Sequence, residues 1–73
     1  MPDSAPPKLW RNQLGERVRG LRLERGWSQE TLAERAELHV TYVSGIERGR
    51  RNVSVDILYR VASAFEVGIR DLF

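Results

Sequence analysis

The residues with the clearest capacity for chemistry are four hydrogen-bond donors that stand close together in the chain. They are Arg48, Arg50, Arg51 and Asn52. The guanidinium of arginine is a planar fork of donors that matches the oxygens of a phosphate and the edge of a guanine. All but one of the twelve basic residues are arginines, which a GC-rich genome also produces, and a run of charge is most often a solvated loop. The place of the four donors in the fold therefore decides their role.

Composition excludes several other chemistries. The chain has 73 residues and a formal net charge of +2, with no cysteine and with His39 as its single histidine. Without cysteine there is no disulfide, no Cys-ligated zinc and no thiol nucleophile, and a lone histidine cannot form a His-pair metal site. No paired carboxylates stand at convergent positions. We expect a protein that is not an enzyme, uses no cofactor or metal, and binds a partner.

Length and hydropathy indicate a small cytoplasmic domain. No stretch approaches the ~18 consecutive apolar residues of a membrane span, and the amino terminus lacks the apolar region of a signal peptide. Residues 1–8 contain all three prolines and are predicted to form a disordered Pro-rich arm before a single domain at residues 9–73. A core of this size usually leaves only ~3–5 kcal/mol of stability unless oligomerisation adds to it.

The spacing of apolar residues predicts an all-α fold, a compact bundle of five short helices. The first helix has a stripe at i, i+4 and i+7 formed by Leu14, Val18 and Leu21. It is expected to end at Gly26, and the third helix at Gly49. Ser28 and Ser54 are expected to cap the second and fourth helices. The later helices are predicted at residues 28–36, 40–48, 54–65 and 69–73.

The second and third predicted helices are joined by so few residues that they must cross steeply. Two crossed helices packed on a third form a helix-turn-helix, whose second helix can enter the major groove of DNA. Two motifs make this specific: R-G-W-S-Q-E-T-L-A at residues 25–33 and Y-V-S-G-I-E-R-G at residues 42–49.

With these motifs, residues 14–73 resemble the lambda-repressor-like, or XRE-type, helix-turn-helix family. Within it, T-Y-V-S-G-I-E-R-G-R-R-N at residues 41–52 is most similar to restriction–modification controller proteins. The resemblance implies a sequence-specific transcriptional regulator, activator or repressor, that controls its own operon. Its implied partners are double-stranded DNA with a palindromic operator and a second copy of itself in a homodimer.

The resemblance also implies which residues contact DNA. They are Gln29, His39, Val40, Thr41, Tyr42, Ser44, Gly45, Arg48, Arg50, Arg51 and Asn52. Gln29 is expected to reach a phosphate from the start of the second helix, Arg51 a base and Asn52 a backbone oxygen. Phosphate neutralisation dominates affinity in such complexes, which favours a DNA-binding role for the arginines over a merely solvated loop.

Four of these positions face the groove from the third helix in such proteins. Thr41 and Ser44 can bond to base edges or phosphates. Val40 stands where relatives often carry a long polar or basic residue, and it offers only apolar contact, for example to a thymine methyl. Gly45 allows a close approach either to DNA or to a neighbouring helix.

Three positions leave alternatives open. His39 stands where the family often has a Ser or Thr cap, so it contacts a phosphate or is an exposed histidine in the turn. Tyr42 lies along the DNA backbone or packs half-buried on the second helix. Glu37 replaces a glycine common in the turn, and a positive φ there would strain it by ~1 kcal/mol or more.

The remaining assignments concern structure and assembly. In relatives the positions of Arg22 and Glu47 form an ion pair that orients the recognition helix without touching DNA. A dimer interface is predicted at the carboxyl end, where the apolar residues exceed what a short final turn can hide. Its candidate residues are Val67, Ile69, Leu72 and Phe73. Ile69 and Leu72 are expected to belong to the core, which leaves Val67 and Phe73 as the dimer contacts, with part of the fourth predicted helix beside them.

A second function class is an antitoxin-like protein-interaction module with secondary DNA binding. An antitoxin generally needs an additional toxin-binding segment, and this chain stops at the fifth predicted helix. We therefore expect the regulator. Selection of bound DNA from a random pool separates the two classes, because only the regulator enriches a palindrome.

Overall fold

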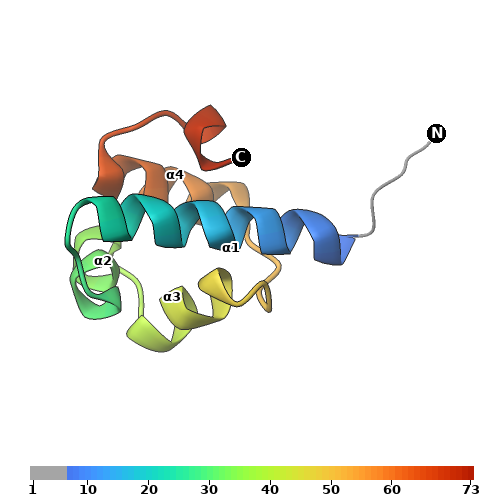
Figure 1. Cartoon of the computed structure of the whole chain (residues 1–73), viewed down its shortest axis with the longest axis horizontal. Coiled ribbons are helices and arrows are strands. Elements are labelled where there is room, and N and C mark those ends of the chain that lie inside the picture. Colours follow the sequence, from blue (N-terminus) through green and yellow to red (C-terminus); the bar gives the residue numbers. More distant parts are fainter. Residues whose placement is uncertain (1–6) are drawn as a thin grey trace.

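The computed structural model describes residues 7–73, with side chains from Leu9 onward, and within that range it contains four α-helices, one 3-10 turn and no strand (Figure 1). The elements are α1 (Pro7–Glu24), α2 (Gln29–Ala36), α3 (Val40–Glu47), α4 (Val55–Phe65) and the 3-10 turn η1 (Ile69–Leu72). The predicted all-α fold is confirmed, with the fifth helix reduced to a 3-10 turn. No helix in the described part of the chain is long and apolar enough to cross a membrane.

The start of α1 differs from the prediction. The helix begins at Pro7, so the proposed disordered arm is wrong for residues 7 and 8, and its residues 1–6 lie outside the described residues. Proline suits the first turn of a helix because its φ is already near the helical value and its missing N–H has no helical partner there.

The helix ends are set by short-range signals that the sequence predicts correctly. The hydroxyls of Ser28 and Ser54 accept hydrogen bonds from backbone N–H groups three residues later, at 3.0 and 3.2 Å. Gly26 and Gly49, which follow α1 and α3, have φ values of +68° and +72°. His39 precedes α3 but makes no side-chain capping bond, so α3 lacks the anchor that the two serines provide elsewhere.

Two glutamates occupy the left-handed backbone region. Glu37 after α2 and Glu66 after α4 have φ values of 59° and 60°. In both places the next N–H turns back onto its helix, from Leu38 to the Ala33 carbonyl at 2.8 Å and from Val67 to the Ala62 carbonyl at 3.0 Å. The strain predicted at Glu37 is therefore present, and Glu66 carries the same strain without any sequence signal that we identified.

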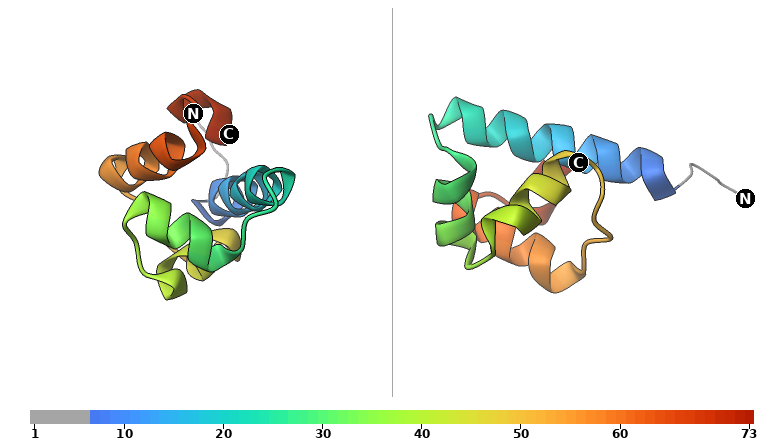
Figure 2. Two further views of the ribbon diagram at one scale, coloured as in Figure 1. Left: turned by 90° about the vertical axis from the view of Figure 1, so that its left-hand side faces the viewer. Right: turned by 90° about the horizontal axis from the view of Figure 1, so that it is seen from below.

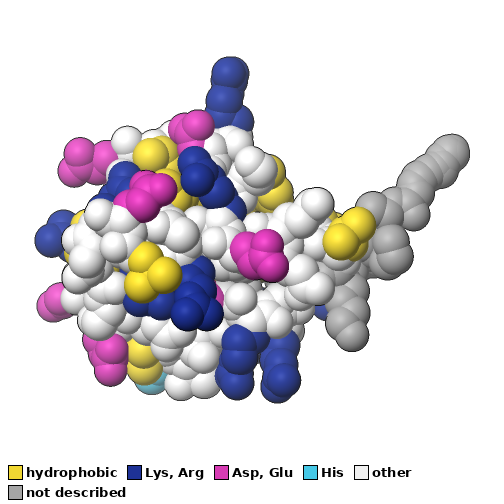
Figure 3. All heavy atoms as spheres, in the orientation of Figure 1, with side chains coloured by type: hydrophobic (Ala, Val, Ile, Leu, Met, Phe, Trp, Pro, Cys, Tyr) yellow, Lys and Arg dark blue, Asp and Glu magenta, His cyan; other side chains and the backbone are white. Residues whose placement is uncertain are grey.

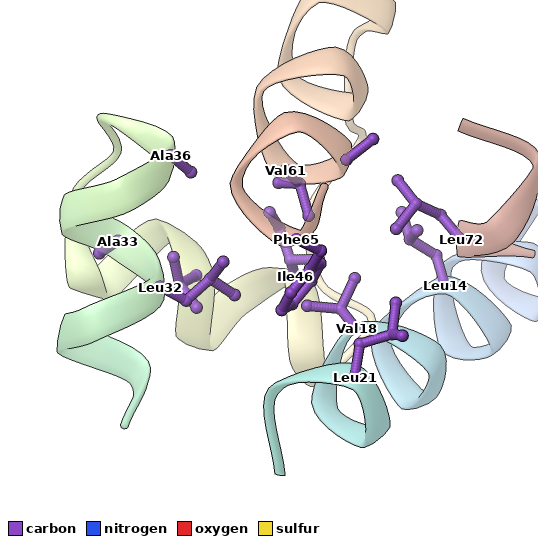
Figure 4. Packing of buried hydrophobic residues seen from close by; sticks show 12 residues of the cluster. Leu14, Val18, Leu21, Leu32, Ala33, Ala36, Ile46, Val61, Phe65 and Leu72 are labelled. Carbon is purple, nitrogen blue, oxygen red and sulfur yellow. The ribbon is translucent and has the colours of Figure 1, made fainter. Parts of the chain in front are cut away.

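A single apolar core joins the elements. Its buried residues are Leu14, Val18, Leu21, Leu32, Ala33, Ala36, Val43, Ile46, Val61, Ala62, Phe65 and Leu72. Figure 4 shows these side chains converging from the four helices and η1. Leu72 is fully buried, which confirms its expected place in the core and removes it from the candidate dimer contacts. Trp27 stacks on Phe65 at 5.5 Å between ring centroids, as expected of a packing residue.

The helices place α3 at one edge of the molecule. In Figure 1 and in the left view of Figure 2, α3 lies at the lower edge and η1 at the upper edge, with α1 between them. The residues of α3 that do not face the core are therefore on the opposite side from the carboxyl end. A partner seated at the carboxyl end leaves α3 uncovered.

A polar cluster fixes the end of α3. The predicted ion pair is present: Arg22 Nε lies 2.7 Å from Glu47 Oε2, and Arg22 Nη2 lies 3.0 Å from Glu47 Oε1. Arg22 Nη1 also donates to the Trp27 carbonyl at 2.8 Å, and Gln29 Nε2 donates to Glu47 Oε1 at 3.1 Å. The cluster thus connects α1, the start of α2 and the end of α3. We call these residues (Arg22, Trp27, Gln29 and Glu47) the α3 anchor.

Burial makes the α3 anchor sensitive to the loss of one partner. The side chains of Arg22 and Glu47 are only 11% and 4% exposed. The hydrogen bond from Arg22 to Glu47, with their mutual attraction, raises the pKa of Arg22 above its ordinary value despite burial. Because this pKa is raised, the stability that protonated Arg22 gives to the fold is fully present at every pH below the ordinary arginine pKa. It is lost only in strong alkali.

A glycine sets the distance between α1 and α3. A Cβ on Gly15 would lie 2.6 Å from the carbonyl oxygen of Glu47, and backbone atoms cannot move aside as a flexible side chain can. In the same helix, Gly20 has nothing within 4 Å of such a Cβ. The sequence analysis did not single out Gly15, because the need for it arises from a helix that is distant along the chain.

The α3 anchor predicts a large asymmetry between two Glu→Ala variants. Glu47→Ala is expected to lower the free energy of unfolding by about 3–5 kcal/mol, since it leaves the guanidinium of Arg22 partly buried without its partner. Glu24 pairs with Arg25 only at 4.0 Å and is 66% exposed, so Glu24→Ala is expected to change stability by less than about 1 kcal/mol. Urea unfolding followed by circular dichroism measures both, and equal values would contradict the role of the anchor.

The two glycines of α1 predict opposite effects of one substitution. Gly15→Ala is expected to destabilise by about 1–3 kcal/mol or more, because the methyl group meets the backbone of α3. Gly20→Ala is expected to stabilise by about 0.5–1 kcal/mol, because alanine favours the helix and the site is open. Thermal unfolding of both variants tests this, and a neutral Gly15→Ala would show that α1 and α3 separate easily.

Candidate nucleic-acid interface

The surface of α3 is divided into a buried and an open face. Val43 and Ile46 belong to the core, as expected from helical spacing. Val40 and Thr41 are exposed and Ser44 is half-buried. The predicted groove-facing side chains at 40, 41 and 44 are thus on the side of the helix that the fold leaves open.

Gly45 differs from the other predicted groove-facing residues. It is buried, and a Cβ on it would lie 2.9 Å from both Cγ and Nε of Arg51. The side chain of Arg51 therefore already occupies the space beside Gly45. The group that approaches Gly45 in the described structure is thus an arginine of the following loop, and the approach of DNA to Gly45 stays a prediction.

Tyr42 is the other side chain in contact with Arg51. The guanidinium carbon of Arg51 lies 4.8 Å from the centre of the Tyr42 ring. Tyr42 is half-buried and packs against the core, in agreement with the packing alternative for this residue. Its ring supports Arg51 in the described structure.

The loop after α3 brings Arg51 back to the helix. Gly49 adopts a positive φ, and the N–H of Arg50 then donates to the Gly45 carbonyl at 2.9 Å. The turn is held against α1, since a Cβ on Gly49 would overlap the side chain of Asn12. The chain therefore reverses at the end of α3 and runs beside it.

Positive charge gathers on this loop, and its own segment of the chain contains a single acidic residue. Arg48, Arg50 and Arg51 are exposed, as is Asn52. Glu47 is the one acidic residue in segment 38–52, and its charge is already paired with Arg22. Figure 3 shows basic side chains projecting at the lower edge of the molecule, on the side where α3 and its loop lie. The four donors of the sequence analysis thus border the open face of α3.

Gln29 and His39 lie at the two helix starts of the helix-turn-helix. Gln29 is half-buried and bound to Glu47, which ties its amide to the end of α3. His39 is exposed and free of a capping bond, so both of its proposed roles remain compatible with its position.

The carboxyl end holds an apolar surface of its own. Val67 and Ile69 are half-buried against the core, whereas Phe73 is 58% exposed and lies 6.4 Å from Trp10 between ring centroids. The sequence analysis missed Val55 and Tyr59, which are 63% and 60% exposed on α4. Their spacing of four residues, off the apolar stripe of that helix, was the available signal.

A helix-turn-helix family model matches residues 18–72. Over 59 residues the chain is 48% identical to the control protein C.BamHI of Bacillus amyloliquefaciens, covering 80% of this chain and 73% of that protein. It is 42% identical over 60 residues to the HTH-type transcriptional regulator DdrOP3 of Deinococcus deserti, covering 82% of this chain and 46% of that longer protein.

A solved structure agrees with these relatives. The restriction-modification controller protein C.AhdI from Aeromonas hydrophila superposes with a TM-score of 0.86 at 43% identity, covering 89% of this chain and 98% of that one. These relatives are regulators and not enzymes, in agreement with the sequence analysis. The chain belongs to the helix-turn-helix family of transcriptional regulators and is similar to restriction–modification controller proteins.

Proposed function

We propose that this protein is a sequence-specific DNA-binding regulator of the restriction–modification controller type, acting as a homodimer on a palindromic operator. The observation that carries the proposal is the open face of α3 bordered by Arg48, Arg50 and Arg51, with no free acid in the same segment. Similarity to C.BamHI and C.AhdI supports the controller assignment, and we include control of its own operon in the proposal.

In the proposed complex α3 lies in the major groove. Thr41 and Ser44 bond to base edges or phosphates, and Val40 contacts a thymine methyl. Arg48, Arg50 and Asn52 bind the phosphate backbone, which fixes the register of the helix on the duplex.

Gln29 links phosphate binding to the α3 anchor. Its amide has two N–H donors, and one of them serves Glu47. The second is available to a phosphate at the start of α2, where the helix dipole also favours an anion. A phosphate held there is positioned relative to α3 through Glu47. His39, exposed at the start of α3, is assigned to the backbone in the same way.

A dimer follows from the size of the module. One such module buries only ~600–1,000 Å² on DNA, and two related by a two-fold axis read half-sites ~34 Å apart. We assign the contact to Phe73, Val67 and Ile69, on the side of the molecule that leaves α3 uncovered (Figure 2). In this proposal residues 9–73 form the DNA-binding and dimerisation domain of a cytoplasmic protein.

DNA selected from a random pool by the full chain is expected to contain a palindrome. With that DNA, Arg48→Ala and Arg50→Ala are each expected to reduce the slope of log affinity against log salt by about one, because each removes one phosphate contact. Thr41→Ala is expected to weaken binding by about 1 kcal/mol. Arg70→Ala, which removes the same charge from η1, is the control and is expected to keep the salt slope. Enrichment of no palindrome would favour the interaction module instead.

The proposed interface predicts a change of oligomeric state. Phe73→Glu is expected to raise the dimer dissociation constant about 10-fold or more, since a buried aromatic side chain contributes at least ~1.5 kcal/mol. Leu23 is similarly exposed, at 55%, but lies on α1, so Leu23→Glu serves as the matched control. Sedimentation equilibrium measures both. If Phe73→Glu remains as dimeric as the control, the contact lies elsewhere, with Val55 and Tyr59 as the next exposed apolar pair.

A further inference from the structure

Arg51 is held in an unusual way for a loop arginine. Its guanidinium carbon lies 4.8 Å from the centre of the Tyr42 ring, and its stem passes over Gly45. Tyr42 and Gly45 are three residues apart in α3, so they are neighbours on one side of the helix. We call this pair the Arg51 cradle.

Both members of the cradle act through Arg51. A Cβ at position 45 would lie 2.9 Å from the Cγ and Nε atoms of Arg51, closer than a real Cβ approaches another atom, so any larger residue displaces the arginine. The guanidinium carbon of Arg51 lies over the Tyr42 ring, 4.8 Å from its centre. The backbone supports the same arrangement, because the N–H of Arg50 is bonded to the carbonyl of Gly45.

The contact with Tyr42 engages the guanidinium through its charge and leaves its hydrogen-bond donors without a conventional partner. Arginine carries five N–H donors in a planar fork, and the contact with the ring is a cation–π contact. Within the described part of the chain, no hydrogen bond or ion pair engages the Arg51 guanidinium, in contrast to Arg22 and Arg25. A guanidinium held in one position with unoccupied donors matches the two acceptors on the edge of a guanine. A phosphate, in contrast, can be bound by a flexible basic side chain.

We propose that Tyr42 and Gly45 are specificity-determining positioning residues, which hold Arg51 beside α3 before DNA binds so that it reads a guanine. This inference rests on the proposed DNA-binding function and adds the base class that Arg51 recognises. The cradle widens the reading surface of a helix whose own side chains, Val40, Thr41 and Ser44, are short. It also removes part of the entropy cost of ordering a flexible arginine, which is worth about 2- to 12-fold in affinity.

The cradle itself is tested in the free protein by NMR. The Cδ protons of Arg51 are expected to be shifted upfield by the Tyr42 ring, and this shift is expected to disappear in Gly45→Ala and in Tyr42→Leu. Gly20→Ala makes the same substitution on α1 where nothing lies within 4 Å, so it is expected to leave the shift intact. If the Arg51 Cδ protons in Gly45→Ala have the same chemical shift as in the wild type, Gly45 does not hold Arg51, and this result needs no DNA measurement.

The consequence is tested on the DNA that the wild type selects. A guanine is expected at one position of each half-site, and replacing it is expected to weaken wild-type binding about 5- to 150-fold. Arg51→Lys keeps the charge but not the fork, so it is expected to lose this preference. Gly45→Ala is expected to reduce the preference for guanine about 2- to 12-fold. It is expected to keep the salt slope of the wild type, because every basic residue is still present. Gly20→Ala is the folded control that keeps the preference.

The outcomes separate this inference from the proposed function. If the wild type selects no site, the proposed function fails. If it selects a site but Gly45→Ala and Tyr42→Leu discriminate guanine as well as the wild type does, the cradle has no role in specificity and the inference is overturned. Where Gly45→Ala does not fold, Tyr42→Leu and Arg51→Lys decide the question alone, and wild-type discrimination in both overturns it.

Discussion

The bidentate contact between Arg22 and Glu47 is the interaction on which the position of α3 depends. A helix of eight residues is far below the ~12–15 residues at which an isolated helix becomes marginal in water, and α3 has no side-chain cap at its start. Its apolar face is buried, which already opposes rotation because rotation would expose Val43 and Ile46. The α3 anchor adds directional hydrogen bonds at the carboxyl end of the helix, and the close contact at Gly15 sets its distance from α1.

The same anchor pairs the one acid of α3 and so separates its charge from the arginines that follow the helix. A free carboxylate at the end of α3 would repel phosphates and weaken the field of the three arginines that follow it. Because Arg22 pairs with Glu47 in a nearly buried site, the segment presents the charge of Arg48, Arg50 and Arg51 without opposition. A formal net charge of only +2 for the chain is therefore compatible with a strongly basic edge. The location of charge, more than its sum, makes this surface suited to DNA.

Reasoning from the residues alone succeeded where the cause is local. The long-range contact that was predicted, between Arg22 and Glu47, came from the family resemblance. Ser28, Ser54, Gly26 and Gly49 were predicted correctly because a cap or a positive φ is determined within a few residues. The requirement for glycine at position 15 could not be predicted, because a side chain there would clash with a backbone carbonyl of α3, about thirty residues away in the chain. The contact between Gly45 and Arg51 was missed for a related reason: it depends on the path of the loop, which no periodicity encodes. The place of Leu72 in the core was expected, because a short final turn holds more apolar residues than it can expose, and the structure confirms it.

Residues that lower the stability of the backbone lie in and near α3, yet a loss of stability does not by itself identify a functional site. Glycine inside α3 weakens the helix by about 1 kcal/mol relative to alanine, and Glu37 just before α3 sits at an unfavourable positive φ. Departures of this kind are expected where function constrains the backbone. Glu66 has the same backbone conformation at the far end of α4, away from α3, and there it serves only to end a helix. What distinguishes Gly45 is that the space it leaves is filled by a side chain with unoccupied donors. Arg51, and not backbone strain, therefore distinguishes the surface of α3.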